Sequence, residues 1–260
     1  MNGPDRRAAF RAERADVLAF CNSLAPADWR MNSRAPGWSI ADVVAHMGSA
    51  CHTTFTPEAL KIMRGDDIER TNDELVAAGR DRPPAEVLAE YRRWSRVFGA
   101  VVPTVGATPL GRVEMPLAEL GRFPARLLTS ALVFDHHTHL RHDMAPALGR
   151  PAPETDANRM AVVLEWMTAV LANELTADTP HWLDRPLALT LTGPGGGTWG
   201  VETSGAVTPG RTQPAAAHIT APALEFPEWG TTRANWRERD VTVTGDVDYG
   251  AVFLDSVNIV

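Results

Sequence analysis

The sequence predicts an α+β protein in which an all-helical domain precedes a small α+β domain. Two observations support this class. Apolar residues recur at three- and four-residue steps through about residue 175, which is typical of amphipathic helices. After about residue 180 the pattern changes to alternation with period two, interrupted by glycine- and proline-rich turns, which is typical of strands. Helices followed by strands indicate two units, and we expect domains of residues 1–178 and 179–260.

The helical part is expected to contain five main segments with identifiable starts and ends. Ser39 with Asp42 three residues later predicts a capped helix start, Pro84 suits a first helical turn, and Pro103 is expected to end that helix. Residues 104–124 are rich in glycine and proline and predict an irregular connection. The expected helices are residues 5–24, 39–51, 84–103, 124–143 and 157–175, with a short one at 72–78.

The last 80 or so residues predict short strands and short helices. Residues 187–192 alternate with period two and precede a glycine-rich turn. That turn lacks the sequence context of a phosphate-binding loop. The expected strands are residues 187–192, 198–202, 217–220 and 240–244, and the expected short helices are 223–229 and 249–259.

Composition excludes several classes of protein. A net charge of −7 argues against a nucleic-acid-binding surface, which normally carries a basic face. No stretch approaches the roughly 18 apolar residues that span a bilayer, so no membrane partner is expected. Cys21 and Cys51 are too few for a disulfide framework, and both are expected to be buried free thiols. We expect a cytoplasmic protein, either a monomer or a homodimer.

Residues 132–143 hold four of the eight histidines and predict a metal site. On an α-helix, positions spaced by 0, 4 and 7 share one face, so Asp135, His139 and His142 are expected to point the same way. Catalytic zinc sites use at least three protein ligands and leave a position open. The best additional donor is His46, on a second apolar helix.

Residues 36–47, Pro-Gly-Trp-Ser-Ile-Ala-Asp-Val-Val-Ala-His-Met, carry a family resemblance. They are similar to the Gly-Trp-Ser/Thr…Asp-Val-x-x-His-Leu motif of the DinB-like superfamily, in the branch named for mycothiol-dependent maleylpyruvate isomerase. The resemblance implies a four-helix bundle holding a divalent metal, usually zinc, through His46, Asp135 and His139. Where this chain has Asp135 the isomerase branch has glutamate, which is one methylene longer. His142 therefore stays open as an alternative ligand, or as a neighbouring residue that orients a ligand or shuttles a proton.

The resemblance also implies a chemistry. A bound cation stabilises the thiolate form of a thiol. In the isomerase, the mycothiol sulfur adds to the double bond of maleylpyruvate, allows rotation and leaves. We therefore expect a small-molecule substrate and a low-molecular-weight thiol as partners, with transfer of the thiol to an electrophile as a related outcome. An arginine of the second domain serves the family reaction, and Arg233 is the best candidate among arginines 233, 237 and 239.

Two other functions are compatible with the sequence. One is a metal-binding protein of this superfamily that lacks catalysis and serves regulation or the stress response. The other is a metal-dependent hydrolase, which needs no thiol. Metal analysis followed by a thiol conjugation assay, with His46→Ala as the test variant, separates the thiol-using enzyme from the metal-binding protein without catalysis.

Overall fold

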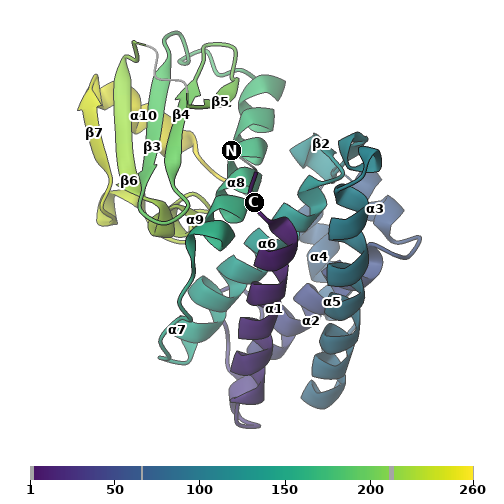
Figure 1. The fold of residues 1–260 in the computed structure, drawn as a ribbon. Coiled ribbons are helices and arrows are strands. Elements are labelled where there is room, and N and C mark those ends of the chain that lie inside the picture. Colours follow the sequence, from purple (N-terminus) through teal and green to yellow (C-terminus); the bar gives the residue numbers. More distant parts are fainter. Residues whose placement is uncertain (1–2, 66, 211–213, 260) are drawn as a thin grey trace. The chain divides into compact units, whose positions relative to one another are not determined.

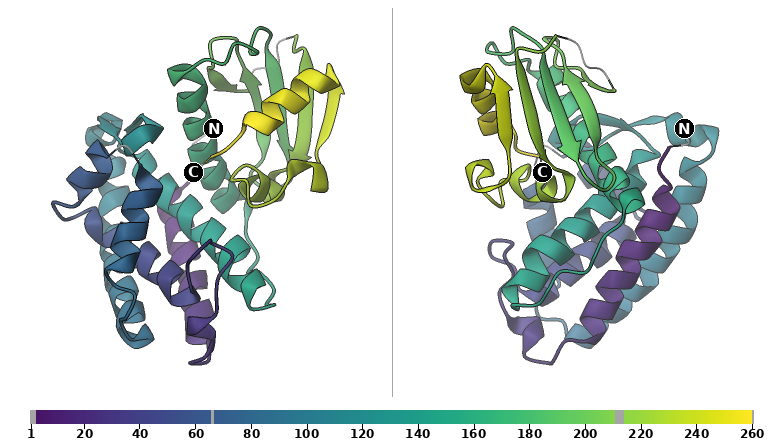
Figure 2. Two further views of the ribbon diagram at one scale, coloured as in Figure 1. Left: turned by 180° about the vertical axis from the view of Figure 1, so that it is seen from behind. Right: turned by 60° about the vertical axis from the view of Figure 1, so that its left-hand side comes forward.

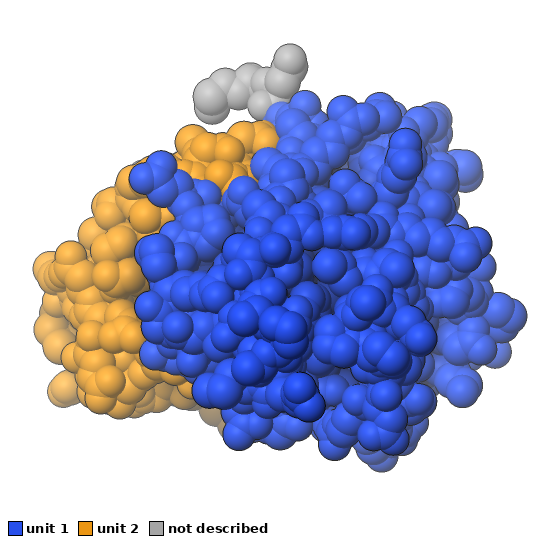
Figure 3. All heavy atoms as spheres, turned by 90° about the horizontal axis from the view of Figure 1, so that it is seen from below, with its two compact units in different colours: residues 1, 3–154 blue, residues 2, 155–260 orange. Residues whose placement is uncertain are grey.

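The computed structural model describes residues 3–65, 67–210 and 214–259. These form two compact units that divide between Glu154 and Thr155, shown in blue and orange in Figure 3. The first unit is helical and the second contains a five-stranded sheet, so the predicted α+β class is confirmed. The division comes earlier than the predicted boundary at residues 178 and 179, because one long helix belongs with the sheet.

Four long helices form the first unit (Figure 1). Helices α1 and α6 pack together, as do α2 and α5, and α5 also contacts α1 and α6. The helices close around fully buried side chains that include Phe10, Val43, Tyr91 and Leu140. They span Arg6–Asn22 (α1), Ile40–Thr53 (α2), Pro84–Gly106 (α5) and Leu127–Thr138 (α6).

Shorter elements connect the four long helices. Helix α5 continues three residues past Pro103, because a proline in the last turn removes only one hydrogen bond. The region predicted as irregular contains a small antiparallel hairpin, β1 with β2. The shorter elements are η1 (Asp28–Arg30), α3 (Ala59–Arg64), α4 (Ile68–Ala77), η2 (Pro109–Arg112), β1 (Glu114–Pro116), η3 (Ala118–Leu120), β2 (Arg122–Pro124), η4 (His139–Met144) and α7 (Ala145–Ala147).

The start of α2 forms as the sequence predicts. The Ser39 side chain accepts a hydrogen bond from the backbone of Asp42, and the Asp42 carboxylate accepts one from the backbone of Ser39, which completes a capping box. Just before the cap, Gly37 adopts a φ of 77°, a conformation that glycine tolerates best. The turn at Gly37 thus leads through Trp38 directly into the capped first turn of α2.

The second unit is a five-stranded sheet in the order β5-β4-β3-β6-β7. Strands β3 and β6 run parallel, and the other neighbours are antiparallel. Along β6, Ala217, Ile219 and Ala221 are buried while His218 and Thr220 are exposed, so one face of the sheet is covered. Helix α10 lies on that face beside β6 and β7 (Figure 2). The elements are α8 (Ala157–Ala177), β3 (Leu187–Thr192), β4 (Gly197–Val201), β5 (Val207–Pro209), β6 (Ala217–Pro222), η5 (Ala223–Glu225), α9 (Phe226–Trp229), η6 (Trp236–Glu238), β7 (Thr242–Gly245) and α10 (Val247–Ser256).

Two glycines show why α8 belongs to the second unit. A Cβ atom on Gly195 would lie 2.5 Å from the carbonyl oxygen of Ala157, in the first turn of α8. A Cβ atom on Gly205 would overlap the carbonyl oxygen of Leu175, in the last turn. Both glycines also have a positive φ, 71° and 81°. The turns that carry these two glycines therefore pack directly against both ends of α8. Local sequence patterns do not predict such long-range contacts.

We expect Gly195→Ala to destabilise the second unit more than Gly193→Ala does. Both residues have a positive φ, but a Cβ atom on Gly193 meets no atom within 4 Å. Gly193→Ala is therefore expected to lower the free energy of unfolding by about 1 kcal/mol, the cost of holding alanine at a positive φ. Gly195→Ala has the same cost and adds steric overlap worth roughly 1–3 kcal/mol more. Urea unfolding of both variants measures the difference, and equal free energies of unfolding would contradict the close packing on α8.

Helix α8 bears on the expectation that no segment of the chain spans a membrane. Among the described residues it is the one helix long and apolar enough to cross a membrane by length and composition. Half of its most apolar window is buried inside the structure. Its apolar side, which includes Met160, Leu164, Met167 and Leu171, is nearly inaccessible to solvent, so packing within the protein accounts for its hydropathy.

Candidate metal centre

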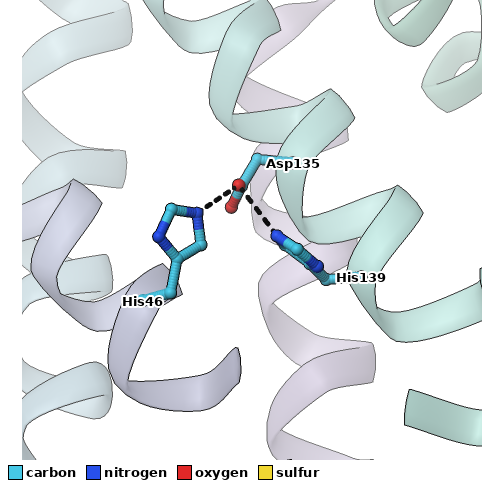
Figure 4. Close-up of side chains that lie close together, drawn as sticks. All are labelled: His46, Asp135 and His139. Carbon is cyan, nitrogen blue, oxygen red and sulfur yellow. Dashed lines mark hydrogen bonds and ion pairs between the residues drawn. The ribbon is translucent and has the colours of Figure 1, made fainter. Parts of the chain in front are cut away.

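Three side chains from two helices converge on one point in the first unit (Figure 4). His46 projects from α2, Asp135 from α6, and His139 from the turn that continues α6. The Nε2 atom of His46 lies 2.9 Å from Oδ1 of Asp135, and Nε2 of His139 lies 3.5 Å from the same oxygen. In the part of the chain that the structure describes, these three residues form the one group whose ligand atoms all lie within 4.8 Å of one another.

The local fold explains why these atoms meet. His46 lies on α2 between Val43, Val44 and Met47, which are fully buried, so its ring is carried toward the bundle interior. Asp135 and His139 are four residues apart, and helical periodicity places them on one face. Both histidines are nearly buried, with exposed fractions of 5% and 8%. Burial on two packed helices gives the site a rigid geometry.

The indole of Trp38 borders both imidazoles. Its ring centroid lies 4.9 Å from that of His46 and 5.9 Å from that of His139. The indole Nε1 donates a hydrogen bond to Asp73 Oδ1 at 2.7 Å, which ties α4 to the site. Trp38 therefore packs against both candidate histidine ligands.

The charge state of Asp135 suits a metal ligand. Burial opposes its ionisation, but the charge of His46, the nearby His136 ring and the hydrogen bond with His46 outweigh it, and the pKa of this carboxyl group lies well below its ordinary value. Nδ1 of His136 lies 3.3 Å from Oδ2, the carboxylate oxygen that does not face the other two ligands. Asp135 is therefore an anion with one oxygen directed at the two imidazoles.

The donor set fits a divalent metal. Two imidazoles and one carboxylate are ligands that zinc prefers in catalytic sites. Zinc bonds of about 2.0–2.2 Å in a tetrahedral site place ligand atoms roughly 3.3–3.6 Å apart. The separations from Asp135 Oδ1 to His46 Nε2 and His139 Nε2, 2.9 and 3.5 Å, are close to this. Three protein ligands also leave a coordination position for a small molecule.

His142 does not join this group, in contrast to the expectation of a shared face. Its ring lies 6.3 Å from that of His137. Residues 139–144 form a π-helical turn, in which hydrogen bonds join residues five apart and the α-helical phase is lost. Of the two residues considered as third ligand, Asp135 is the one that the structure places beside His46 and His139. A catalytic role for His142 remains a prediction.

Sequence reasoning missed one residue next to the ligands. The buried carboxylate of Asp143 lies 2.7 Å from Nδ1 of His139. The four-residue spacing from His139 to Asp143 is the signal that could have identified it, because residues at this spacing meet on a helix surface.

The three arginine candidates belong to the second unit. Arg237 forms an ion pair with Asp255, with NH2 to Oδ2 at 2.8 Å, and Arg239 forms one with Glu228 at 2.9 Å. Arg233 is exposed, in the segment that follows α9. The role of Arg233 remains a prediction.

Cys21 and Cys51 are buried free thiols, as the sequence predicts. Burial raises the pKa of Cys21 to about 12, although the charge of Arg92 opposes the shift. Burial, with the charge of Asp135, raises the pKa of Cys51 well above its ordinary value. Since the thiolate is the nucleophile of cysteine chemistry, neither residue is suited to attack a substrate.

Comparisons with known proteins agree with this architecture. The chain is 17% identical to the mycothiol-dependent maleylpyruvate isomerase and 16% identical to a histidine-to-alanine variant of it. Both crystal structures share the fold, with a TM-score of 0.56 over 93% of each chain. An uncharacterized protein of Mycobacterium tuberculosis, from strains CDC 1551 and H37Rv, is 29% identical over 92% of this chain and 89% of its own length.

The family assignment comes from the helical unit. Residues 10–140, half of the chain, match the mycothiol maleylpyruvate isomerase N-terminal domain. The matched segment includes His46, Asp135 and His139. The chain therefore belongs to the mycothiol maleylpyruvate isomerase N-terminal domain family, as its motifs predicted.

Proposed function

We propose that this protein is a metal-dependent enzyme that uses a low-molecular-weight thiol to isomerise, or to conjugate, a small electrophilic acid. The observation that carries the proposal is the convergence of His46, Asp135 and His139 on one point in the helical unit. Zinc is the first candidate for the metal, and mycothiol is the candidate thiol because the family is named for it. We further propose that the reaction takes place in the cytoplasm, where the two free cysteines stay reduced.

The thiol must come from outside the chain. Cys21 and Cys51 are buried and have raised pKa values, so the protein offers no thiolate of its own. A divalent metal held by the three ligands would supply a positive charge that favours the thiolate form of an added thiol near neutral pH. The indole of Trp38 packs beside both imidazoles, with ring centroids 4.9 and 5.9 Å away.

The proposed isomerisation conserves all atoms. The thiolate sulfur forms a bond to one carbon of the cis double bond, and the π electron pair moves to the conjugated carbonyl oxygen. The former double bond is then a single bond and rotates. The electron pair returns, the carbon–sulfur bond breaks, and the thiolate leaves with the trans isomer. We assign Arg233 the role of binding the substrate carboxylate, because a guanidinium fork matches a carboxylate, and we retain His142 as a candidate proton carrier.

We expect purified protein to contain about one zinc per chain and to convert maleylpyruvate to fumarylpyruvate only when mycothiol is added. His46→Ala should lose both the metal and the activity, because two ligands hold zinc poorly. His52→Ala is the matched control, since this half-buried histidine of α2 lies outside the ligand group, and it should retain both. Elemental analysis, absorbance assays and circular dichroism measure metal, turnover and fold.

Other results would favour the alternatives. Metal binding without turnover, with maleylpyruvate or with a generic electrophile plus a thiol, would favour a metal-binding protein without catalysis. Turnover of an ester or amide in the absence of any thiol would favour a hydrolase. Full activity of a folded His46→Ala variant would show that the activity does not depend on the proposed metal centre.

A further inference from the structure

The imidazole of His139 is held at both ring nitrogens. Nε2 lies 3.5 Å from Asp135 Oδ1, within the ligand group, and Nδ1 lies 2.7 Å from Oδ2 of Asp143. The Asp143 side chain is completely buried. A carboxylate removed from water needs hydrogen-bond donors, and the short distance indicates a strong bond to the ring.

This contact decides which ring nitrogen carries the proton. A neutral imidazole has one N–H group and one nitrogen with a free electron pair. A carboxylate only accepts hydrogen bonds, and both ring nitrogens of His139 face one. The contact of Nδ1 with Asp143, at 2.7 Å, is much shorter than that of Nε2 with Asp135, at 3.5 Å, so the geometry favours the proton of the neutral ring on Nδ1. The electron pair is then on Nε2, the nitrogen that faces Asp135, and a metal ligand needs its electron pair there.

The main chain fixes the position of Asp143. The residue lies in the π-helical turn of residues 139–144, and its carbonyl oxygen accepts a hydrogen bond from the backbone of Arg34 at 3.1 Å. Arg34 belongs to the segment between η1 and Trp38, so the loop that carries Trp38 also anchors the turn that carries Asp143. The carboxylate is therefore held under the His139 ring by two separate parts of the first unit.

We propose that Asp143 is a positioning residue that fixes the tautomer and ring orientation of His139 for metal binding. The inference rests on the proposed metal centre and goes further by assigning the chemical state of one ligand. A carboxylate bound to the far nitrogen of a ligating histidine also makes the ligating nitrogen more basic. Asp143 would thus strengthen the metal centre without touching the metal.

A second buried histidine–carboxylate pair, between α6 and α1, provides a matched control. Nδ1 of His137 lies 3.0 Å from Oε1 of Glu13, and both side chains are buried. This pair resembles the pair of His139 with Asp143, but His137 is not in the ligand group. Loss of the Glu13 carboxylate therefore reports the general effect of breaking a buried histidine–carboxylate pair.

The test compares Asp143→Asn, Asp143→Leu and Glu13→Gln with the unaltered chain, by zinc titration calorimetry and by ¹⁵N NMR of the histidine rings in metal-free protein. We expect the two Asp143 variants to bind zinc about 10- to 100-fold more weakly, and Glu13→Gln to bind it with unchanged affinity. The NMR spectrum of the unaltered chain should show His139 protonated on Nδ1, and Asp143→Leu should shift the proton to Nε2.

The two measurements separate the possible failures. His139 protonated on Nε2 in the unaltered chain would overturn the role of Asp143, and this observation needs no variant that folds. Unchanged zinc affinity in folded Asp143→Leu would also overturn it. An unaltered chain that binds no zinc would overturn the proposed metal centre instead, and the NMR result would still decide whether Asp143 sets the tautomer.

Discussion

His139→Ala is expected to weaken zinc binding by more than about 100-fold, which exceeds the loss typical of residues that only support a ligand. The substitution removes one of the three donors that converge in the helical unit, and the remaining pair, His46 and Asp135, cannot complete a zinc site. Titration calorimetry of metal-free protein with zinc measures the affinity, and a thermal melt with and without zinc reports the same loss as a missing stabilisation.

His142→Ala is the control for this prediction. The two histidines lie in the same π-helical turn, but the ring of His142 is beside His137 and outside the ligand group. We expect this variant to bind zinc like the unaltered chain. If His142→Ala lost zinc, His142 would be a ligand, and the ligand set derived from the structure would be wrong.

Glu13→Gln is expected to lower the free energy of unfolding by about 3–5 kcal/mol, the usual cost of breaking a buried ion pair. Glu13 is completely buried and accepts hydrogen bonds from Arg141 NH1 at 2.6 Å and from His137. The substitution leaves the Arg141 charge buried without this counter-ion. Asp16→Asn is the control, because this carboxylate also binds Arg141 but is 29% exposed, and we expect a loss below about 1 kcal/mol.

The contacts of Glu13 with His137 and Arg141 also predict that the free energy of unfolding depends on pH. Burial raises the pKa of Glu13, but the hydrogen bond and charge of His137 and the charge of Arg141 outweigh it, so the pKa lies below its ordinary value of 4.5. A depressed carboxyl pKa stabilises the folded state above pH 4.5, and this stabilisation is lost as the pH falls through the folded-state pKa. Urea unfolding at several pH values should show that Glu13→Gln loses less stability on acidification than the unaltered chain does. Parallel plots of the free energy of unfolding against pH for the two proteins would contradict the proposed contacts of Glu13 with His137 and Arg141.

Local sequence patterns were sufficient for most helices and strands. The capped start of α2 depends on Ser39 and Asp42, which are three residues apart, and α8 follows from its helical periodicity. Strand β3 follows from its alternation. The hairpin of β1 with β2 was not predicted, because three-residue strands are too short to show a period.

The position of the unit boundary and the set of residues around the candidate metal centre could not be predicted from local patterns, because both depend on how the chain folds in three dimensions. Helix α8 has the same periodic pattern as the helices before it. Its contacts with the second unit, among them the packing of Gly195 and Gly205 against its ends, assign it to that unit. In the same way, the spacing of Asp135 and His139 predicted a pair of ligands. The π-helical turn then moved His142 away from these ligands.

The sequence by itself determined the fold class, the family and the three candidate ligands, because capping, periodicity and the motif around His46 are local properties of the chain. The tertiary structure alone decided that α2 and α6 bring His46, Asp135 and His139 within 4.8 Å of one another, and which carboxylate supports which histidine. The physical reason is that helix packing and the phase of a helical turn depend on contacts between residues far apart in the sequence.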